Sequence, residues 1–211
     1  MLSFNNISKS YGSHLVFSIP ELELGKGVYW LKGSNGAGKS TLLKTMAGLL
    51  PFKGDIILNK TVSLKKNPVN YRFLVNHAEA EPQYPAFLSG EELTRFVSSI
   101  KKGTEQQITE LKEILGIDNY LNNPSGSYSS GMLKKLSLLL AFIGQPEWIL
   151  LDEPLTTLDT ATQESLCRLI NQKHKSGISF LLTSHHDIET TSIPFNAIFL
   201  IKDKELKQVG R

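Results

Sequence analysis

The sequence predicts an α/β fold with a mixed sheet, an N-terminal antiparallel β-subdomain and an inserted α-helical subdomain. Three observations support this class. A glycine-rich loop at 33–41 joins an apolar run to a helix-like segment, short β-type runs fill the first part of the chain, and residues from about 84 to 145 have helical spacing. At 211 residues the chain suits one domain, whose core comprises about 1–83 and 146–211.

Strands are expected on both sides of the glycine loop. The β-type runs at 2–7, 16–19 and 22–24 are separated by turn residues, as in antiparallel hairpins. Beyond the loop, breaker residues precede an apolar run at 56–58, and a further run at 71–75 has the composition of a buried strand. We therefore predict a strand in each of these runs.

The glycine-rich loop has the pattern of a phosphate-binding P-loop, G-x-x-x-x-G-K-[ST]. An apolar run before it predicts a buried strand, and helically spaced apolar residues after it predict a helix. Its glycines allow the backbone N–H groups to face a polyphosphate, Lys39 can contact the β- and γ-phosphates, and the Ser40 hydroxyl can bind Mg²⁺. These features predict a P-loop NTPase core. The loop consists of Gly33, Ser34, Asn35, Gly36, Ala37, Gly38, Lys39, Ser40 and Thr41.

The inserted subdomain is expected to be helical. Ser89 with Glu92, and Thr104 with Gln107, have the spacing of capping boxes, and apolar residues follow each pair at helical intervals. A last helix at 132–143 is apolar on nearly every side, which predicts burial on most sides. Its few polar residues are Lys134, Lys135 and Ser137.

The last part of the chain alternates strands with a helix. Apolar runs predict strands at 148–151, 178–182 and 197–201, and a capping box of Thr160 with Gln163 predicts the start of the intervening helix. This alternation is typical of parallel strands joined by helical crossovers.

Two adjacent acids follow the expected strand at 148–151. Asp152 and Glu153 come directly after it, and sheets of this kind bind ligands at the carboxyl ends of their strands. In P-loop ATPases one acid at this place holds Mg²⁺, and a second carboxylate near the γ-phosphate polarises the attacking water. We therefore assign Asp152 to Mg²⁺, together with Ser40, and Glu153 to the water.

Composition narrows the class of partner and the compartment. The net charge is +3, with 23 basic and 20 acidic residues, so no nucleic acid is expected as a partner. Cys167 is the only cysteine, which excludes an internal disulfide and agrees with a reducing compartment. The polar N-terminus is unlike a signal peptide, and no apolar run reaches the length of about 18 residues that spans a membrane.

A second anion site is predicted just before the apolar helix. Tyr128, Ser129, Ser130, Gly131 and Met132 place hydroxyl and amide groups at a helix N-terminus. Because this segment lies between the P-loop and the acidic strand, the chain resembles an ATP-binding cassette (ABC) ATPase, whose signature motif, commonly LSGGQ, has the same place. The resemblance covers nearly the whole chain.

In that family two cassettes pack head to tail, so the resemblance implies a second ABC subunit, identical or different, with ATP at the interface. The signature segment 129–132 of one subunit would contact the ATP held by the P-loop of the other. Asp159 resembles the aspartate of the loop that crosses the interface, and Tyr11 the aromatic residue that stacks on adenine. His185 resembles the switch histidine near the γ-phosphate, with His186 as an alternative.

The chain departs from the family at one position. A glutamine that senses Mg²⁺ and couples to the membrane partner is expected just after the run 71–75, and His77 occupies its place. Gln83 lies six residues farther on and could replace the glutamine through a looped-out segment. Glu79 is a third candidate, and the sequence leaves this choice open.

The resemblance implies ATP hydrolysis, with ATP and Mg²⁺ bound, that drives transport through separate transmembrane permease subunits. Lys39 and the signature would stabilise charge on the transferring phosphoryl group. The chain would then be cytoplasmic and peripheral on the cytoplasmic face of the membrane. Alternatives are a soluble cassette that acts as an ATP-controlled clamp on ribosomes or DNA, and a P-loop kinase or GTPase. The first would carry tandem cassettes, a coiled-coil insertion or a basic face, and the second would lack the signature.

Overall fold

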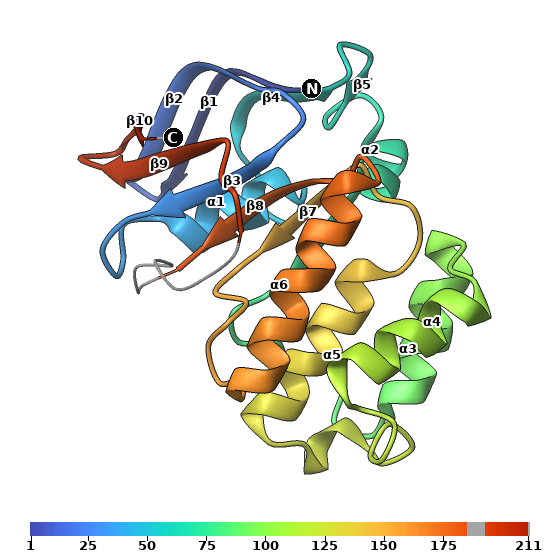
Figure 1. Ribbon diagram of the computed structural model, residues 1–211. Coiled ribbons are helices and arrows are strands. Elements are labelled where there is room, and N and C mark those ends of the chain that lie inside the picture. Colours follow the sequence, from blue (N-terminus) through green and yellow to red (C-terminus); the bar gives the residue numbers. More distant parts are fainter. Residues whose placement is uncertain (185–192, 211) are drawn as a thin grey trace.

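Two β-sheets lie at the centre of the structure, a computed structural model that describes residues 1–184 and 193–210 (Figure 1). In the larger sheet only β10 runs antiparallel to its neighbour, and the other pairs are parallel. The sheet is therefore mixed, as predicted. Its strands, in order across the sheet, are β10 (Glu205–Gly210), β9 (Ala197–Lys202), β3 (Val28–Lys32), β8 (Ser179–Thr183), β7 (Trp148–Leu151) and β6 (Val75–Ala78).

The smaller sheet is antiparallel and N-terminal, which confirms that part of the prediction. The runs at 16–19 and 22–24, expected as separate strands, belong to one strand that continues through Pro20. This strand lies at the edge of the sheet, where a proline without an N–H donor is tolerated. In order, the strands are β2 (His14–Leu24), β1 (Leu2–Tyr11), β4 (Lys53–Leu58) and β5 (Val62–Ser63).

The larger sheet is buried on both faces. Along β7, Trp148 and Leu150 face one hydrophobic cluster, whereas Ile149 and Leu151 face another, because side chains alternate along a strand. The first cluster lies between the two sheets and includes apolar residues of α1 (Lys39–Met46). The second includes apolar residues of α5 (Ser130–Phe142) and α6 (Thr160–Lys175). Burying each such Leu or Ile side chain stabilises the fold by about 1.5–3 kcal/mol.

Helices occupy residues 90–142 (Figure 1). They are α3 (Gly90–Lys101), α4 (Glu105–Leu115), a short 3-10 turn η1 (Ser125–Ser127) and α5. Ser89 forms the predicted capping box, because its hydroxyl accepts from Glu92 N–H and the Glu92 carboxylate accepts from Ser89 N–H. Both α3 and α4 pack against α5, and α4 also packs against α6.

Two predicted boundaries are wrong. The run 71–75 is mostly helical, because α2 (Pro68–Leu74) begins with a proline in its first turn and buries Tyr71, and strand β6 starts only at Val75. Proline suits the start of a helix, where its missing N–H is not needed. The helix expected to be capped by Thr160 and Gln163 is instead capped by Asp159, whose carboxylate accepts from Thr162 N–H.

Candidate functional site

The glycine loop lies between β3 and α1, so the predicted order of strand, loop and helix is confirmed. Gly38 is the N-cap residue of α1 and has a φ of 102°, a conformation that favours glycine. A Cβ at this position would lie 2.7 Å from Val16 Cγ1. Both constraints require glycine, and they leave the N-terminus of α1 uncovered by a side chain at residue 38.

Lys39 is buried at the first position of α1, with an exposed fraction of 5%. Its Nζ donates to Gly33 O at 2.8 Å and to Ser34 O at 3.1 Å. The ammonium is therefore held inside the loop that its own backbone forms. A third N–H donor of the ammonium remains for a ligand oxygen.

A cavity of about 420 Å³ joins the loop to Tyr11 and Glu153. Tyr11 ends β1, is 53% exposed, and has Lys9 Nζ 4.5 Å from its ring centroid. Sequence reasoning missed His14 and Val16 in this cavity, although they begin the strand after the Tyr11 turn. The cavity is lined by Tyr11, His14, Val16, Asn35, Gly36, Gly38, Lys39, Ser40, Thr41 and Glu153.

The two acids after β7 are buried and share a hydrogen-bond partner. Asp152 is 1% exposed and Glu153 is 6% exposed. The Thr183 hydroxyl donates to Asp152 Oδ1 at 2.6 Å, and Glu153 N–H donates to Thr183 Oγ1 at 2.9 Å. Sequence reasoning gave Thr183 no role, because its contact with Asp152 spans 31 residues along the chain.

Glu153 has a φ of 50°, in the left-handed region that non-glycine residues rarely adopt. Such strain, of about 1–3 kcal/mol, persists only where the surrounding structure fixes the backbone. Here the hydrogen bond from Glu153 N–H to Thr183 provides one such constraint. The turn at Glu153 places a buried carboxylate at the edge of the phosphate-loop cavity.

A second cavity, of about 880 Å³, shares Ser40 and Glu153 with the first. Its Ser40 hydroxyl and Asp152 carboxylate are oxygen ligands of the kind that Mg²⁺ prefers. The described residues contain no cluster of three His, Cys, Asp or Glu side chains able to hold a metal. The cavity is lined by Ser40, Lys44, Glu79, Ala80, Glu81, Gln83, Asp152, Glu153, Thr156 and Thr157.

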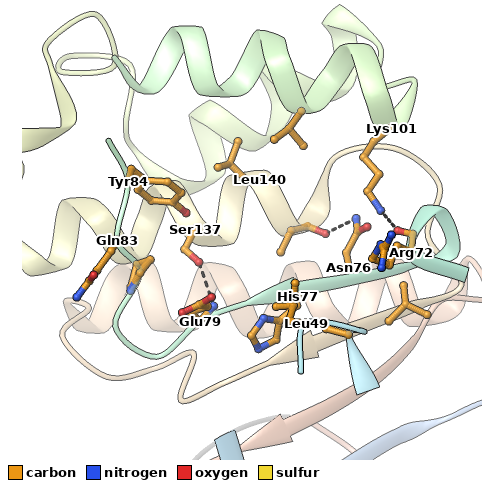
Figure 2. A pocket seen from close by; sticks show the side chains of 15 residues that line it. Leu49, Arg72, Asn76, His77, Glu79, Gln83, Tyr84, Lys101, Ser137 and Leu140 are labelled. Atoms are coloured by element: carbon orange, nitrogen blue, oxygen red, sulfur yellow. Dashed lines mark hydrogen bonds between the residues drawn. The ribbon is translucent and has the colours of Figure 1, made fainter. Parts of the chain in front are cut away.

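The three candidates for the missing glutamine differ in whether they reach the cavity of Ser40 and Asp152. Glu79 and Gln83 line the cavity that contains Ser40 and Asp152, whereas His77 does not. All three candidates line another cavity, beside α3 and α5 (Figure 2). Burial lowers the pKa of His77. The Glu79 carboxylate is 3.0 Å from Lys44 Nζ. The geometry therefore favours Glu79 or Gln83 over His77.

The signature segment lies at the exposed N-terminus of α5. The Ser129 hydroxyl caps this helix by accepting from Met132 N–H at 3.3 Å, and both Ser129 and Ser130 are exposed. At Gly131 a Cβ would lie 3.0 Å from Thr157 O. Residues 129–132 line neither of the two cavities, so one chain does not bring the signature to its own P-loop site.

Asp159 connects α6 to α5, the helix that begins with the signature segment and is called the signature helix. Its carboxylate accepts from Thr162 N–H and lies 3.2 Å from Lys135 Nζ. The hydrogen bonds from Thr162, followed by the contact with Lys135, hold the pKa of Asp159 far below its usual range. His185 and His186 lie outside the described residues, so the switch-histidine assignment stays a prediction.

Comparison with known proteins establishes the family. The profile of the ABC transporter family matches residues 21–156. The cytochrome c biogenesis ATP-binding export protein CcmA of Legionella pneumophila is 35% identical over 163 residues, which cover 77% of this chain and 80% of CcmA. The lantibiotic transport ATP-binding protein SrtF of Streptococcus pyogenes is 30% identical over 187 residues, covering 88% of this chain and 80% of SrtF.

Solved structures agree on the fold. An ATP-binding subunit of an ABC transporter superimposes with a TM-score of 0.88 at 23% identity, covering 100% of this chain and 90% of that one. A dimeric ATP-binding cassette bound to ADP and Pi gives 0.83 at 18% identity, covering 100% of this chain and 98% of that one. Among the described residues no helix has the length and apolar character of a membrane span. The chain belongs to the ABC transporter family, as an ATP-binding subunit with the α/β P-loop NTPase fold.

Proposed function

We propose that this subunit hydrolyses ATP in the two adjoining cavities, with Glu153 as the general base. The observation that carries the proposal is that Glu153 lines both cavities, between the P-loop and the Ser40 and Asp152 oxygens. In this arrangement the Glu153 carboxylate accepts a proton from water that attacks the γ-phosphorus, and the bond to the ADP oxygen breaks. Lys39 supplies a fixed positive charge beside the transferring phosphoryl group.

Ser40 and Asp152 would hold Mg²⁺, and Tyr11 would stack on adenine. When bound, Mg²⁺ would neutralise charge on the β- and γ-phosphates. Asp152 is held for this role by the Thr183 hydroxyl, which donates to Oδ1, and the residue lines the cavity that contains Ser40. Tyr11 supports adenine binding because its ring is half exposed and it lines the same cavity as the P-loop.

The proposal includes a second cassette. The exposed Ser129 and Ser130 line neither cavity of their own chain, yet they cap a helix N-terminus that suits a phosphate. A head-to-tail partner would bring this segment to the ATP of the first chain, with Asp159 near the interface through its contact with Lys135.

The sizing of Glu153→Gln protein with ATP tests the dimer. A species of twice the chain mass of 23.5 kDa supports a homodimer. Association only with a different cassette copurified from the same cells supports a heterodimer. If ATP does not change the measured size of the chain, either alone or mixed with the other cassette, the shared site is ruled out.

A cytoplasmic segment of a transmembrane permease would dock beside α3 and α5, which places the subunit on the cytoplasmic face of the membrane. A cavity of about 360 Å³ lies there (Figure 2). Two buried atoms that line it, Asn76 Oδ1 and His77 Nε2, lack hydrogen-bond partners among the described residues. Leu49, also in its lining, is 52% exposed. Copurification with a polytopic membrane protein, lost in Leu49→Glu, supports this surface, whereas unchanged recovery contradicts it.

A further inference from the structure

Lys134 is the most deeply buried cation of the signature helix. Its side chain leaves α5 less than two turns after the N-cap Ser129, and the residue is 1% exposed. Its Nζ donates to Asp152 O at 2.9 Å, to Ala80 O at 3.0 Å and to Glu79 O at 3.1 Å. An ammonium has three N–H donors, so these three backbone carbonyls use its full capacity.

These contacts join three parts of the site. Asp152 follows β7, Glu79 and Ala80 follow β6, and Lys134 belongs to the helix that carries the signature. The ends of β6 and β7 are already joined by the hydrogen bond from Asp152 N–H to Ala78 O at 2.9 Å. Lys134 connects the signature helix to these two strand ends. Its position lies about 7.5 Å along the helix axis from Ser129.

The charges around Lys134 favour an ammonium at this place. Burial is the largest effect and lowers the pKa of Lys134 to about 8. The nearby carboxylates of Asp152, Glu153 and Glu81 act in the opposite direction and stabilise the charged form. His77 also lies within electrostatic range. Burying a cation is costly unless acceptors and opposite charges surround it. An apolar side chain would fill the space without that cost, so packing alone does not account for the lysine.

We propose that Lys134 is a positioning residue for hydrolysis, which fixes the Asp152–Glu153 backbone and the 79–80 segment relative to the signature helix. The inference rests on the proposed function, since it takes Glu153 as the base. When the ATP of a partner contacts the signature helix and displaces it, Lys134 would transmit the movement to Asp152 and Glu153. Lys134 has no contact with the P-loop among its hydrogen bonds, so it acts on the chemical step and not on ATP affinity.

The experiment compares Lys134→Met, which removes the donors at similar length, with Lys134→Gln, whose amide keeps two donors. We expect Lys134→Met to lower kcat by about tenfold or more, as small misplacements of catalytic groups do, with the Kd for ATP within about twofold of wild type. Lys134→Gln should retain an intermediate kcat. If the Met variant does not fold, the Gln variant provides the test: a reduced kcat at an unchanged Kd for ATP supports the positioning role, and a wild-type kcat contradicts it. The matched control is Lys112→Met, which removes a lysine of α4 that is paired with Glu91 of α3.

Hydrogen exchange provides a readout that does not depend on turnover. The amides of residues 79, 80, 81 and 83 should exchange faster in Lys134→Met, whereas those of β4 should not change. Wild-type kcat in both variants, or parallel losses of kcat and ATP affinity, would overturn the positioning role. An equal loss in Lys112→Met would do the same. Failure of the proposed function is distinguishable, because it would appear as ATP turnover in Glu153→Gln equal to that of wild type.

Discussion

The Thr183 hydroxyl donates a 2.6 Å hydrogen bond to Asp152 Oδ1, and this contact joins the ends of two parallel strands. The same hydroxyl oxygen accepts from Glu153 N–H, so one threonine contacts the side chain of Asp152 and the backbone of Glu153. Because both carboxylates are buried, their positions depend on such contacts more than on solvent.

Thr183→Val should lower both the free energy of unfolding and the affinity of the proposed site for Mg²⁺. Removing the hydroxyl leaves a buried carboxylate oxygen without its donor, which costs about 1–3 kcal/mol of unfolding free energy. Urea unfolding measures this loss, and ATP turnover at varied Mg²⁺ should require a higher Mg²⁺ concentration. Thr94→Val is the control, since Thr94 is equally buried but donates to Gly90 O within α3. A Mg²⁺ requirement that shifts equally in both variants would argue against the role of Thr183.

Lys39→Ala should weaken ATP binding itself. A charge-assisted contact with phosphate contributes about 1.5–3 kcal/mol, so the Kd should rise by roughly 10- to 150-fold. Titration with a fluorescent ATP analogue measures the change. Lys112→Ala is a suitable comparison, because Lys112 pairs with Glu91 and lines neither cavity of the proposed site. An unchanged Kd in Lys39→Ala would refute the phosphate contact.

The contribution of Asp159 to stability should depend on pH. Its folded-state pKa lies below the usual value of about 3.9. A lowered carboxylate pKa adds stability above the unfolded-state pKa, and that stability is lost as the pH falls toward the folded-state value. Asp159→Ala should therefore lower Tm at pH 7, and the difference from wild type should narrow at pH 3. A difference that is constant from pH 7 to pH 3 would show that the ionised cap is not responsible.

The sequence alone predicted those features whose chemistry requires particular residue types at a particular spacing. The P-loop, the acids after β7 and the serine cap of α5 all lie where expected along the chain. The error at 71–75 arose because a short run with four apolar residues fits a strand and a buried helix equally well. The signal that could have corrected it is Pro68, which favours the first turn of a helix.

The contacts of Thr183 and Lys134 could not have been predicted from periodicity. They join residues 31 and as many as 55 positions apart, so they appear only once the strands and α5 are placed. Lys134 was expected as a polar exception on an apolar helix, and the structure shows it fully buried instead. The one-residue shift of the α6 cap from Thr160 to Asp159 has a local cause, since both residue types cap helices well.

ATP turnover by Glu153→Gln tests the central claim most directly. The amide keeps the shape of the side chain but cannot accept the proton of the attacking water, and loss of a general base slows turnover by about 10²- to 10⁴-fold. We predict that kcat falls by this amount while the Kd for ATP stays close to the wild-type value. Wild-type turnover by purified Glu153→Gln protein would contradict the assignment of Glu153 as the base.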